Sequence, residues 1–137
     1  VKEGYVPPIH DFEILSPEGE DMTATVLNEK DYSFLLISPN LKTADDQNFG
    51  DIDRIYEFCN DRNFSFRCLT ASSEEDILNW QNLTGAEYPF FFTDATTLKT
   101  IVRSNPGLVM LRNGVVVGKW SHNRLPNPET LEMMVKK

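Results

Sequence analysis

An uninterrupted apolar run in the first third of the chain constrains the fold more than any other feature. Residues 32–38, Tyr-Ser-Phe-Leu-Leu-Ile-Ser, carry no charge, and Pro39 follows them. A strand with one face in water alternates apolar and polar residues, whereas this run is apolar at four consecutive positions. The run therefore predicts a central strand that lies parallel to a neighbour and is covered on both faces.

The next segments supply that neighbour. Apolar residues recur at helical spacing at Ile52, Ile55, Tyr56 and Cys59, which predicts an amphipathic helix. Residues 64–70 then alternate in the manner of a strand. Strand, helix and strand form a β-α-β unit, and such crossovers are almost always right-handed.

A second helix is expected after this unit. Ser72 or Ser73 caps its first turn, because a hydroxyl accepts a hydrogen bond from a free backbone amide there, and Gly85 ends it. Its apolar residues are expected to form the buried side of the helix: Ile77, Leu78, Trp80 and Leu83.

The last third predicts an antiparallel hairpin and a closing helix. Residues 108–111 and 115–120 flank Asn113-Gly114, a dipeptide that favours a type I′ turn and so fixes the register of the two strands. Pro128 suits the first turn of a helix. Turn and cap residues predict the remaining elements: a hairpin over 9–22, a helical turn over 23–27, an extended segment over 88–92 and a helix over 94–102.

The charge of the chain restricts its partners. Its 137 residues carry 13 Lys and Arg against 21 Asp and Glu, a net charge of −8. This charge repels phosphate backbones and anionic lipids, so no nucleic-acid binding is expected. No window reaches the roughly 18 apolar residues of a membrane span. The chain opens on Val1 rather than methionine, which we interpret as a processed protein or a piece of a longer one.

Residues 103–114, Arg-Ser-Asn-Pro-Gly-Leu-Val-Met-Leu-Arg-Asn-Gly, resemble the proline, strand and Asn-Gly hairpin of the thioredoxin family. The resemblance covers nearly the whole chain and implies a single thioredoxin-like domain over residues 1–137. The implied fold is α/β, with a central mixed β-sheet flanked by helices and an N-terminal β-hairpin like that of the TlpA and peroxiredoxin branch. It also implies a cis bond before Pro106.

Three shorter segments carry a narrower resemblance. Residues 68–73, 84–90 and 119–122 are similar to the thioredoxin-like domain attached to DoxX-type bacterial membrane proteins. This resemblance implies that the chain is a soluble domain joined covalently to a membrane domain. The side of the membrane stays open, with the periplasm favoured.

The chain departs from the thioredoxin family where the redox chemistry resides. Oxidoreductases of the family carry Cys-x-x-Cys just after the first central strand, and peroxiredoxins carry a peroxidatic cysteine there, but residues 38–46 contain no cysteine. Disulfide exchange requires an accessible thiolate, which a hydroxyl cannot replace. We therefore expect a non-catalytic binding, sensing or structural module, with neither metal nor cofactor.

The expected partner site is a groove around Ser38, Pro39, Asn105 and Pro106. A cis X-Pro bond costs only about 0.5–1 kcal/mol relative to trans. It would let Asn105 offer its backbone amide and carbonyl to an extended segment of a protein or peptide partner. The alternative is that the bond only completes the turn into the next strand.

The alternative interpretation, that the chain is an enzyme, depends on its two cysteines. Cys59 lies on the apolar side of its predicted helix and Cys68 lies within a predicted strand, so both are expected to be inert core thiols. A structural disulfide and a slow redox switch are the other interpretations. A thiol-disulfide oxidoreductase would have to use one of these two residues, or a thiol from a partner chain.

A third interpretation is a self-associating structural domain. An edge strand, or a recognition loop of Trp120, His122 and Arg124, would form a homodimer interface, since Trp and Arg are favoured there. Alternatively, Trp120 only covers the end of the core.

Four acids lie around the start of one predicted helix. They could bind a hard cation through carboxylate oxygens, but the helix dipole also stabilises solvated acids at that end. We favour solvated carboxylates at these positions: Asp45, Asp46, Asp51 and Asp53.

Overall fold

The computed structural model describes residues 13–28, 30–44, 49–101 and 105–135. These residues form five helices and five strands, with a single 3₁₀ turn, η1 (His122–Arg124), before the last helix. The helices are α1 (Thr23–Leu27), α2 (Phe49–Asp61), α3 (Glu74–Thr84), α4 (Ala95–Ile101) and α5 (Pro128–Val135). The strands are β1 (Tyr32–Ser38), β2 (Ser65–Thr70), β3 (Phe90–Phe92), β4 (Gly107–Arg112) and β5 (Val115–Ser121).

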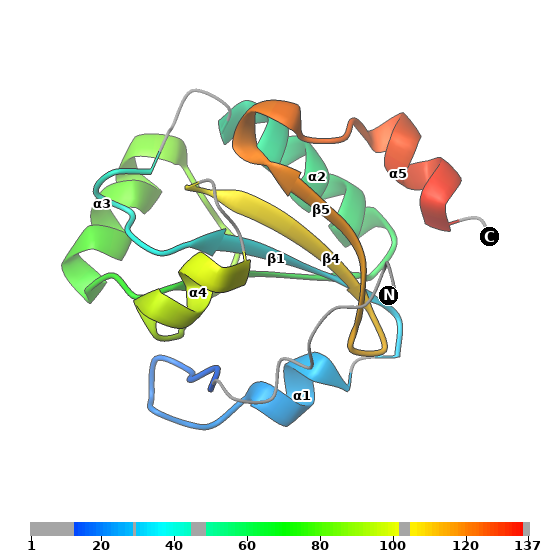
Figure 1. The fold of residues 1–137 in the computed structure, drawn as a ribbon. Coiled ribbons are helices and arrows are strands. Elements are labelled where there is room, and N and C mark those ends of the chain that lie inside the picture. The colour runs from blue at the N-terminus through cyan, green and yellow to red at the C-terminus, as the bar shows by residue number, and fades with distance from the viewer. Residues whose placement is uncertain (1–12, 29, 45–48, 102–104, 136–137) are drawn as a thin grey trace.

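The strands form one mixed sheet in the order β3-β2-β1-β4-β5 (Figure 1). β1, β2 and β3 are parallel, while β4 is antiparallel to both β1 and β5. In the register of the sheet, Leu36 of β1 lies opposite Cys68 of β2 on one side and Leu108 of β4 on the other. The expected central position of residues 32–38 is confirmed.

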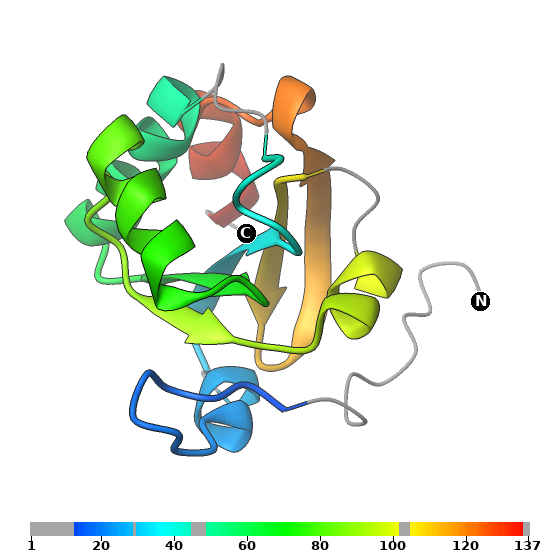
Figure 2. The same ribbon diagram turned by 90° about the vertical axis from the view of Figure 1, so that its left-hand side faces the viewer.

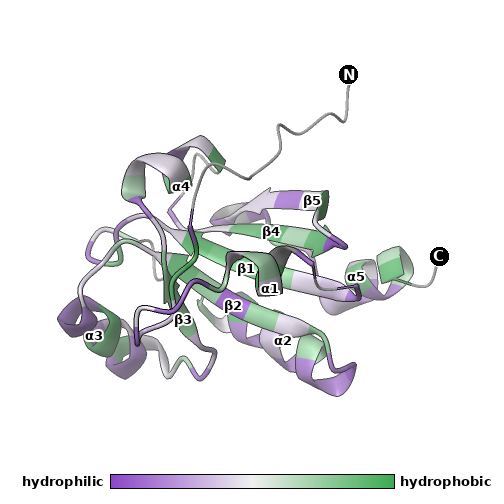
Figure 3. Ribbon diagram, turned by 90° about the horizontal axis from the view of Figure 1, so that it is seen from below, coloured by the Kyte–Doolittle hydropathy of each residue, from purple (hydrophilic) through white to green (hydrophobic). Residues whose placement is uncertain are grey.

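Alternate residues of each strand point to opposite faces of this sheet, and each face has its own apolar core. Phe34 and Leu36 of β1 lie in the core beneath α2, α3 and α5, whereas Leu35 and Ile37 lie in the core beneath α1 and α4. The edge-on view shows these helices on the two sides of the sheet (Figure 2), and the strands between them are largely apolar (Figure 3). The apolar run is therefore covered on both faces, as predicted.

Several predicted ends of elements are confirmed. The Ser73 hydroxyl accepts a hydrogen bond from the Asp76 amide at 3.2 Å, and Gly85 ends α3 with a φ of 75°. Asn113 and Gly114 both have positive φ, 54° and 79°, as a type I′ turn requires. The Asn105-Pro106 bond is cis, as the resemblance implied.

The predicted buried side of α3 is partly wrong. Ile77 and Trp80 are buried, but Leu78 and Leu83 are 56% and 60% exposed. Residues 77, 80 and 84 fall on one stripe of a 3.6-residue helix, and these are the buried residues of α3. The two leucines lie on either side of the stripe and face water.

The register of the β4–β5 hairpin also differs from the expectation. Leu111 lies opposite Val116, but Met110 lies opposite Gly118, so β5 carries a bulge with one extra residue. The indole of Trp120 lies against Gly118, where a Cβ atom would stand 2.3 Å from the ring. The turn therefore fixes the register only as far as the bulge.

The described part of the predicted N-terminal hairpin is reduced to a single bridge. Leu15 pairs with Asp21 across a turn, and Leu15 also pairs with Phe92 at the edge of β3. Residues 9–12, which begin its first arm, lie outside the described residues. Ile14 is fully buried in the core under α1 and α4, which fixes this segment to the sheet.

Candidate functional site

The candidate site lies at the edge of the sheet where the parallel strands end. Ser38 ends β1 directly opposite Thr70, which ends β2, and both side chains are fully buried. The cis Asn105-Pro106 bond leads into β4 at the same edge, since Gly107 lies opposite Ile37. Ligands of open α/β sheets commonly bind at this end of the strands.

The side chain of Asn105 joins the two segments. Its Oδ1 accepts a hydrogen bond from the Ser38 hydroxyl at 2.6 Å. Its Nδ2 donates to the Asn40 carbonyl at 2.7 Å and to the Thr43 hydroxyl at 3.1 Å. One side chain therefore holds the loop after β1 against the turn before β4.

The same loop has a second attachment, to the segment after β2. The Leu41 amide donates to the Ser72 hydroxyl at 2.8 Å, and the Ser72 amide donates to the Thr70 hydroxyl at 3.1 Å. Leu41 is buried in the core beneath α2. The loop is thus tied to two neighbouring strand ends as well as to the hydrophobic core.

These hydrogen bonds occupy the side chain of Asn105 at the predicted groove. Ser38, Pro39 and Pro106 are buried, and Asn105 is half-buried with its side chain already bonded within the protein. The surface over this junction is formed by exposed residues that the sequence interpretation did not select: Asn40, Lys42 and Thr43. Their position directly after a buried strand is the signal that could have identified them.

Neither cysteine lies at this junction. Cys59 of α2 and Cys68 of β2 are both fully buried in the core beneath α2, α3 and α5, and both are free thiols. Burial raises the pKa of Cys59 to about 12, against the opposing charge of Arg62, and burial also raises the pKa of Cys68. Thiols in this setting do not supply the thiolate that disulfide exchange requires.

The residues of the predicted recognition loop lie at the end of β5 and in the 3₁₀ turn that follows it. Trp120 is half-buried and packs against the core beneath α2, α3 and α5. His122 is half-buried and Arg124 is exposed, and both belong to the 3₁₀ turn that follows β5. The indole thus covers part of the core, which is the simpler of its two interpretations.

The acids considered for a cation are only partly described, because Asp45 and Asp46 lie outside the described residues. Asp51 accepts a hydrogen bond from Arg54 at 2.6 Å. The pKa of Asp53 is raised, first by burial and then by the charges of Glu57 and Glu87. Among the described residues no three His, Cys, Asp or Glu side chains are grouped so that they could hold a metal.

A scan against protein-family models and a search of curated proteins found no match to this sequence. Solved structures do match. A thio-disulfide isomerase from Thermus thermophilus is 15% identical with a TM-score of 0.65, and the match covers 94% of this chain and 92% of that one. A thiol-disulfide oxidoreductase from Bacteroides fragilis is 13% identical with a TM-score of 0.65, covering 90% and 93%.

StoA from Bacillus subtilis is a further structural neighbour, 11% identical with a TM-score of 0.61 over 93% of this chain and 98% of that one. These likenesses establish that the chain has a thioredoxin-like fold. By name, one of these neighbours is a thiol-disulfide oxidoreductase and another is a thio-disulfide isomerase, but at these identities the likeness concerns the fold alone. In the described residues no helix has the length and apolar character needed to cross a membrane.

Proposed function

We propose that the chain is a thioredoxin-fold module that binds a protein or peptide partner without thiol-disulfide catalysis. The observation that carries this proposal is the junction after β1. No cysteine stands there, and Asn105 accepts a hydrogen bond from the Ser38 hydroxyl and donates to the Asn40 carbonyl and the Thr43 hydroxyl in the following loop. The reactive part of the fold is replaced by a fixed polar junction.

The positions of the two thiols support the same proposal. A thiol with the pKa of Cys59, about 12, is ionised to only about one part in 10⁵ at pH 7. Nucleophilic attack on a disulfide also requires access, and both sulfur atoms are buried in the core. Catalysis through Cys59 or Cys68 would first require the core to open.

The hydrogen-bonded loop after β1 supports a binding role. Asn40, Lys42 and Thr43 are exposed. The Asn105 amide holds this loop through the Asn40 carbonyl and the Thr43 hydroxyl, and the Ser72 hydroxyl holds it through the Leu41 amide. A surface that is ordered before binding loses less conformational entropy when a partner arrives. We propose that the partner contacts these residues together with the backbone next to Pro106.

The first experiment measures reduction of insulin by dithiothreitol in the presence of the protein. We expect the uncatalysed rate, because the described thiols are buried and protonated. The double variant Pro39→Cys with Lys42→Cys restores Cys-x-x-Cys spacing at the junction and tests whether the scaffold can support the reaction. Turnover by the unmodified protein would overturn the proposal.

Thiol labelling provides an independent measurement. Cys59 and Cys68 are expected to react with a thiol reagent only after the protein is unfolded in denaturant. Rapid labelling of either residue in the native protein would instead favour the alternative oxidoreductase that uses an unusual cysteine.

We further propose that this module is attached to a bacterial membrane protein of the DoxX type, with the module on the periplasmic side. Support comes from the sequence similarity of residues 68–73, 84–90 and 119–122. The test is membrane fractionation of cells that express the complete natural reading frame. Release of the whole protein by alkaline carbonate would contradict attachment, and protease protection in spheroplasts would contradict a periplasmic location.

A further inference from the structure

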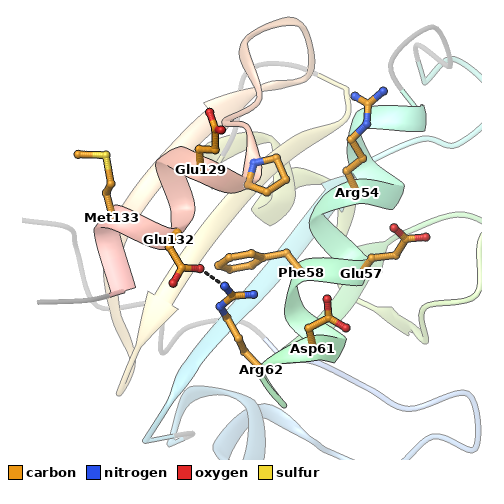
Figure 4. A pocket seen from close by; sticks show the side chains of 9 residues that line it. Arg54, Glu57, Phe58, Asp61, Arg62, Glu129, Glu132 and Met133 are labelled. Atoms are coloured by element: carbon orange, nitrogen blue, oxygen red, sulfur yellow. Dashed lines mark hydrogen bonds and ion pairs between the residues drawn. The ribbon is translucent and has the colours of Figure 1, made fainter.

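A groove with a volume of about 650 Å³ lies between α2 and α5 (Figure 4). None of the residues that form the Asn105 junction lines it. Part of its wall is apolar: the ring of Phe58, the ring of Pro128 and the side chain of Met133. Met133 is 70% exposed, so this wall includes a large apolar side chain that no other part of the described chain covers.

Both arginines of the groove already have partners. Arg62 forms an ion pair with Glu132, and its guanidinium lies 4.0 Å from the centre of the Phe58 ring. Arg54 pairs with Asp51 at 2.6 Å. The positive charges of the groove are therefore neutralised within the protein.

Three carboxylates of the groove have no ion-pair partner among the described residues. Glu57 and Asp61 of α2, with Glu129 of α5, line it, and none of them forms an ion pair within the described residues. The two arginines do not neutralise these carboxylates, because Arg62 is paired with Glu132 and Arg54 is paired with Asp51. The groove thus presents uncompensated negative charge beside an exposed apolar wall.

The two α2 acids that line the groove, Glu57 and Asp61, are unfavourable for the helix itself. Asp53, Glu57 and Asp61 follow one another at intervals of four residues, where like charges repel by about 0.2–0.5 kcal/mol per pair. Asp61 stands at the C-terminal end of the helix, where the dipole disfavours an anion, and no basic residue lies in the last turn. Glu57 and Asp61 therefore do not stabilise the helix, which is the pattern expected where charge serves binding.

We propose that this groove docks a basic amphipathic segment of a partner protein. Lysine or arginine side chains of that segment would face Glu57, Asp61 and Glu129, and an apolar side chain would pack against Phe58 and Met133. The proposal goes beyond the binding role given above, because it concerns a different face of the molecule and does not depend on the Asn105 junction.

The charge of the chain selects this occupant over others. A second copy would bring a net charge of −8 to a groove that is already acidic, and nucleic acids and anionic membranes are repelled in the same way. A small cation would satisfy the carboxylates but would leave the apolar wall exposed. A basic segment with an apolar face complements both features.

To test this proposal, isotope-labelled protein is titrated with a synthetic helical peptide of lysine and leucine, and binding is monitored by two-dimensional NMR. Amide shifts are expected to concentrate in residues 54–62 and 128–135. The same peptide with glutamate in place of lysine is expected to cause no shifts. Shifts centred on another surface, no shifts at millimolar peptide, or equal binding of the acidic peptide would each overturn the proposal.

A charge-matched pair of variants separates groove binding from general attraction. The triple variant Glu57→Gln, Asp61→Asn and Glu129→Gln is expected to weaken peptide binding by about tenfold, with unchanged or higher thermal stability. The control variant changes the net charge equally at exposed acids away from the groove and is expected to lose less than about twofold. Its substitutions are Glu18→Gln, Glu20→Gln and Asp31→Asn. Equal losses in the two variants would overturn the proposal.

The apolar wall is tested by Met133→Ser, which is expected to weaken binding by about threefold without altering the charge. An unchanged affinity would contradict the amphipathic part of the proposal. Shifts in the same residues that grow with protein concentration in the absence of peptide would identify a second copy as the occupant instead. None of these readouts involves the thiols or Asn105, so their failure would leave the insulin and labelling results unaffected.

Discussion

Asn105 uses its whole side-chain amide within the protein. Its oxygen accepts from the buried Ser38 hydroxyl, and its nitrogen donates both to the Asn40 carbonyl and to Thr43. A buried hydroxyl left without a partner is costly, so the identity of this residue is coupled to that of Ser38. The amide joins two segments that are 67 residues apart in the chain.

We predict that Asn105→Ala lowers the free energy of unfolding by about 1–3 kcal/mol, since it removes all three of these hydrogen bonds. Guanidinium denaturation followed by far-UV circular dichroism measures the change. Asn82→Ala, at an exposed position of α3, is the matched control and should stay within about 0.5 kcal/mol of the natural protein. Similar stability of the two variants would show that the junction contributes little.

Sequence reasoning could select Ser38, Asn105 and Pro106, because each is placed by a strand end or by the family resemblance. It could not show that the Asn105 side chain turns inward, since a hydrogen bond between segments so far apart leaves no local pattern. The hydrogen bond of Ser72 to the loop was missed for the same reason, whereas Asn40 was not selected although it lies directly after the buried strand. The burial of Cys59 and Cys68 was predictable, because apolar neighbours at helix and strand spacing surround both.

At the scale of elements, the strongest sequence signals were those with a short-range cause. The apolar run of β1, the serine cap of α3 and the Asn-Gly turn each follow from residues within one element. The exposed leucines of α3 and the bulge of β5 depend on what packs against those elements. The contact between Trp120 and Gly118 is the clearest of these tertiary effects.

We predict that Gly118→Ala destabilises the fold by about 1–3 kcal/mol, because the new methyl group would collide with the indole of Trp120. The control is Gly50→Ala in the first turn of α2, where a Cβ atom meets nothing within 4 Å. That change should be neutral or stabilising by up to about 1 kcal/mol, since alanine favours a helix. Urea denaturation measures both, and equal stabilities would exclude close packing of Trp120 on the strand.

At the scale of the whole molecule, the two hydrophobic cores lie on opposite faces of one sheet, so the helices of both faces pack against the same strands. Every central strand contributes side chains to both cores, as Leu36 and Ile37 of β1 illustrate. That residues 1–137 form a single domain remains a prediction. If the prediction is right, circular dichroism and tryptophan fluorescence will report one common unfolding transition.

We predict that stability falls as the pH rises above about 9. Unfolded thiols ionise near their ordinary pKa of 9.0, whereas the pKa of Cys59 in the folded protein is about 12. The pKa values of Cys68 and Tyr88 are also raised by burial. From the unfolded pKa upward, the unfolded state therefore loses protons that the folded state retains, and each group costs up to about 1.4 kcal/mol per pH unit.

Urea denaturation at several values from about pH 7 to about pH 10.5 measures this slope, which should be absent below the ordinary thiol pKa. Cys59→Ala should make the alkaline slope shallower while lowering stability at every pH through the cavity it leaves. A slope that is unchanged by this substitution would show that Cys59 ionises normally in the folded protein.

The two edges of the sheet are each shielded in a different way. The outer edge of β3 is occupied at Phe92 by Leu15, and the outer strand β5 is interrupted by its bulge and carries Lys119, whose ammonium donates to the Ile101 carbonyl at 2.9 Å. Irregular and charged edges resist templated strand addition. At the high protein concentrations of a cell, this architecture hinders growth of an amyloid-like fibre from the folded state.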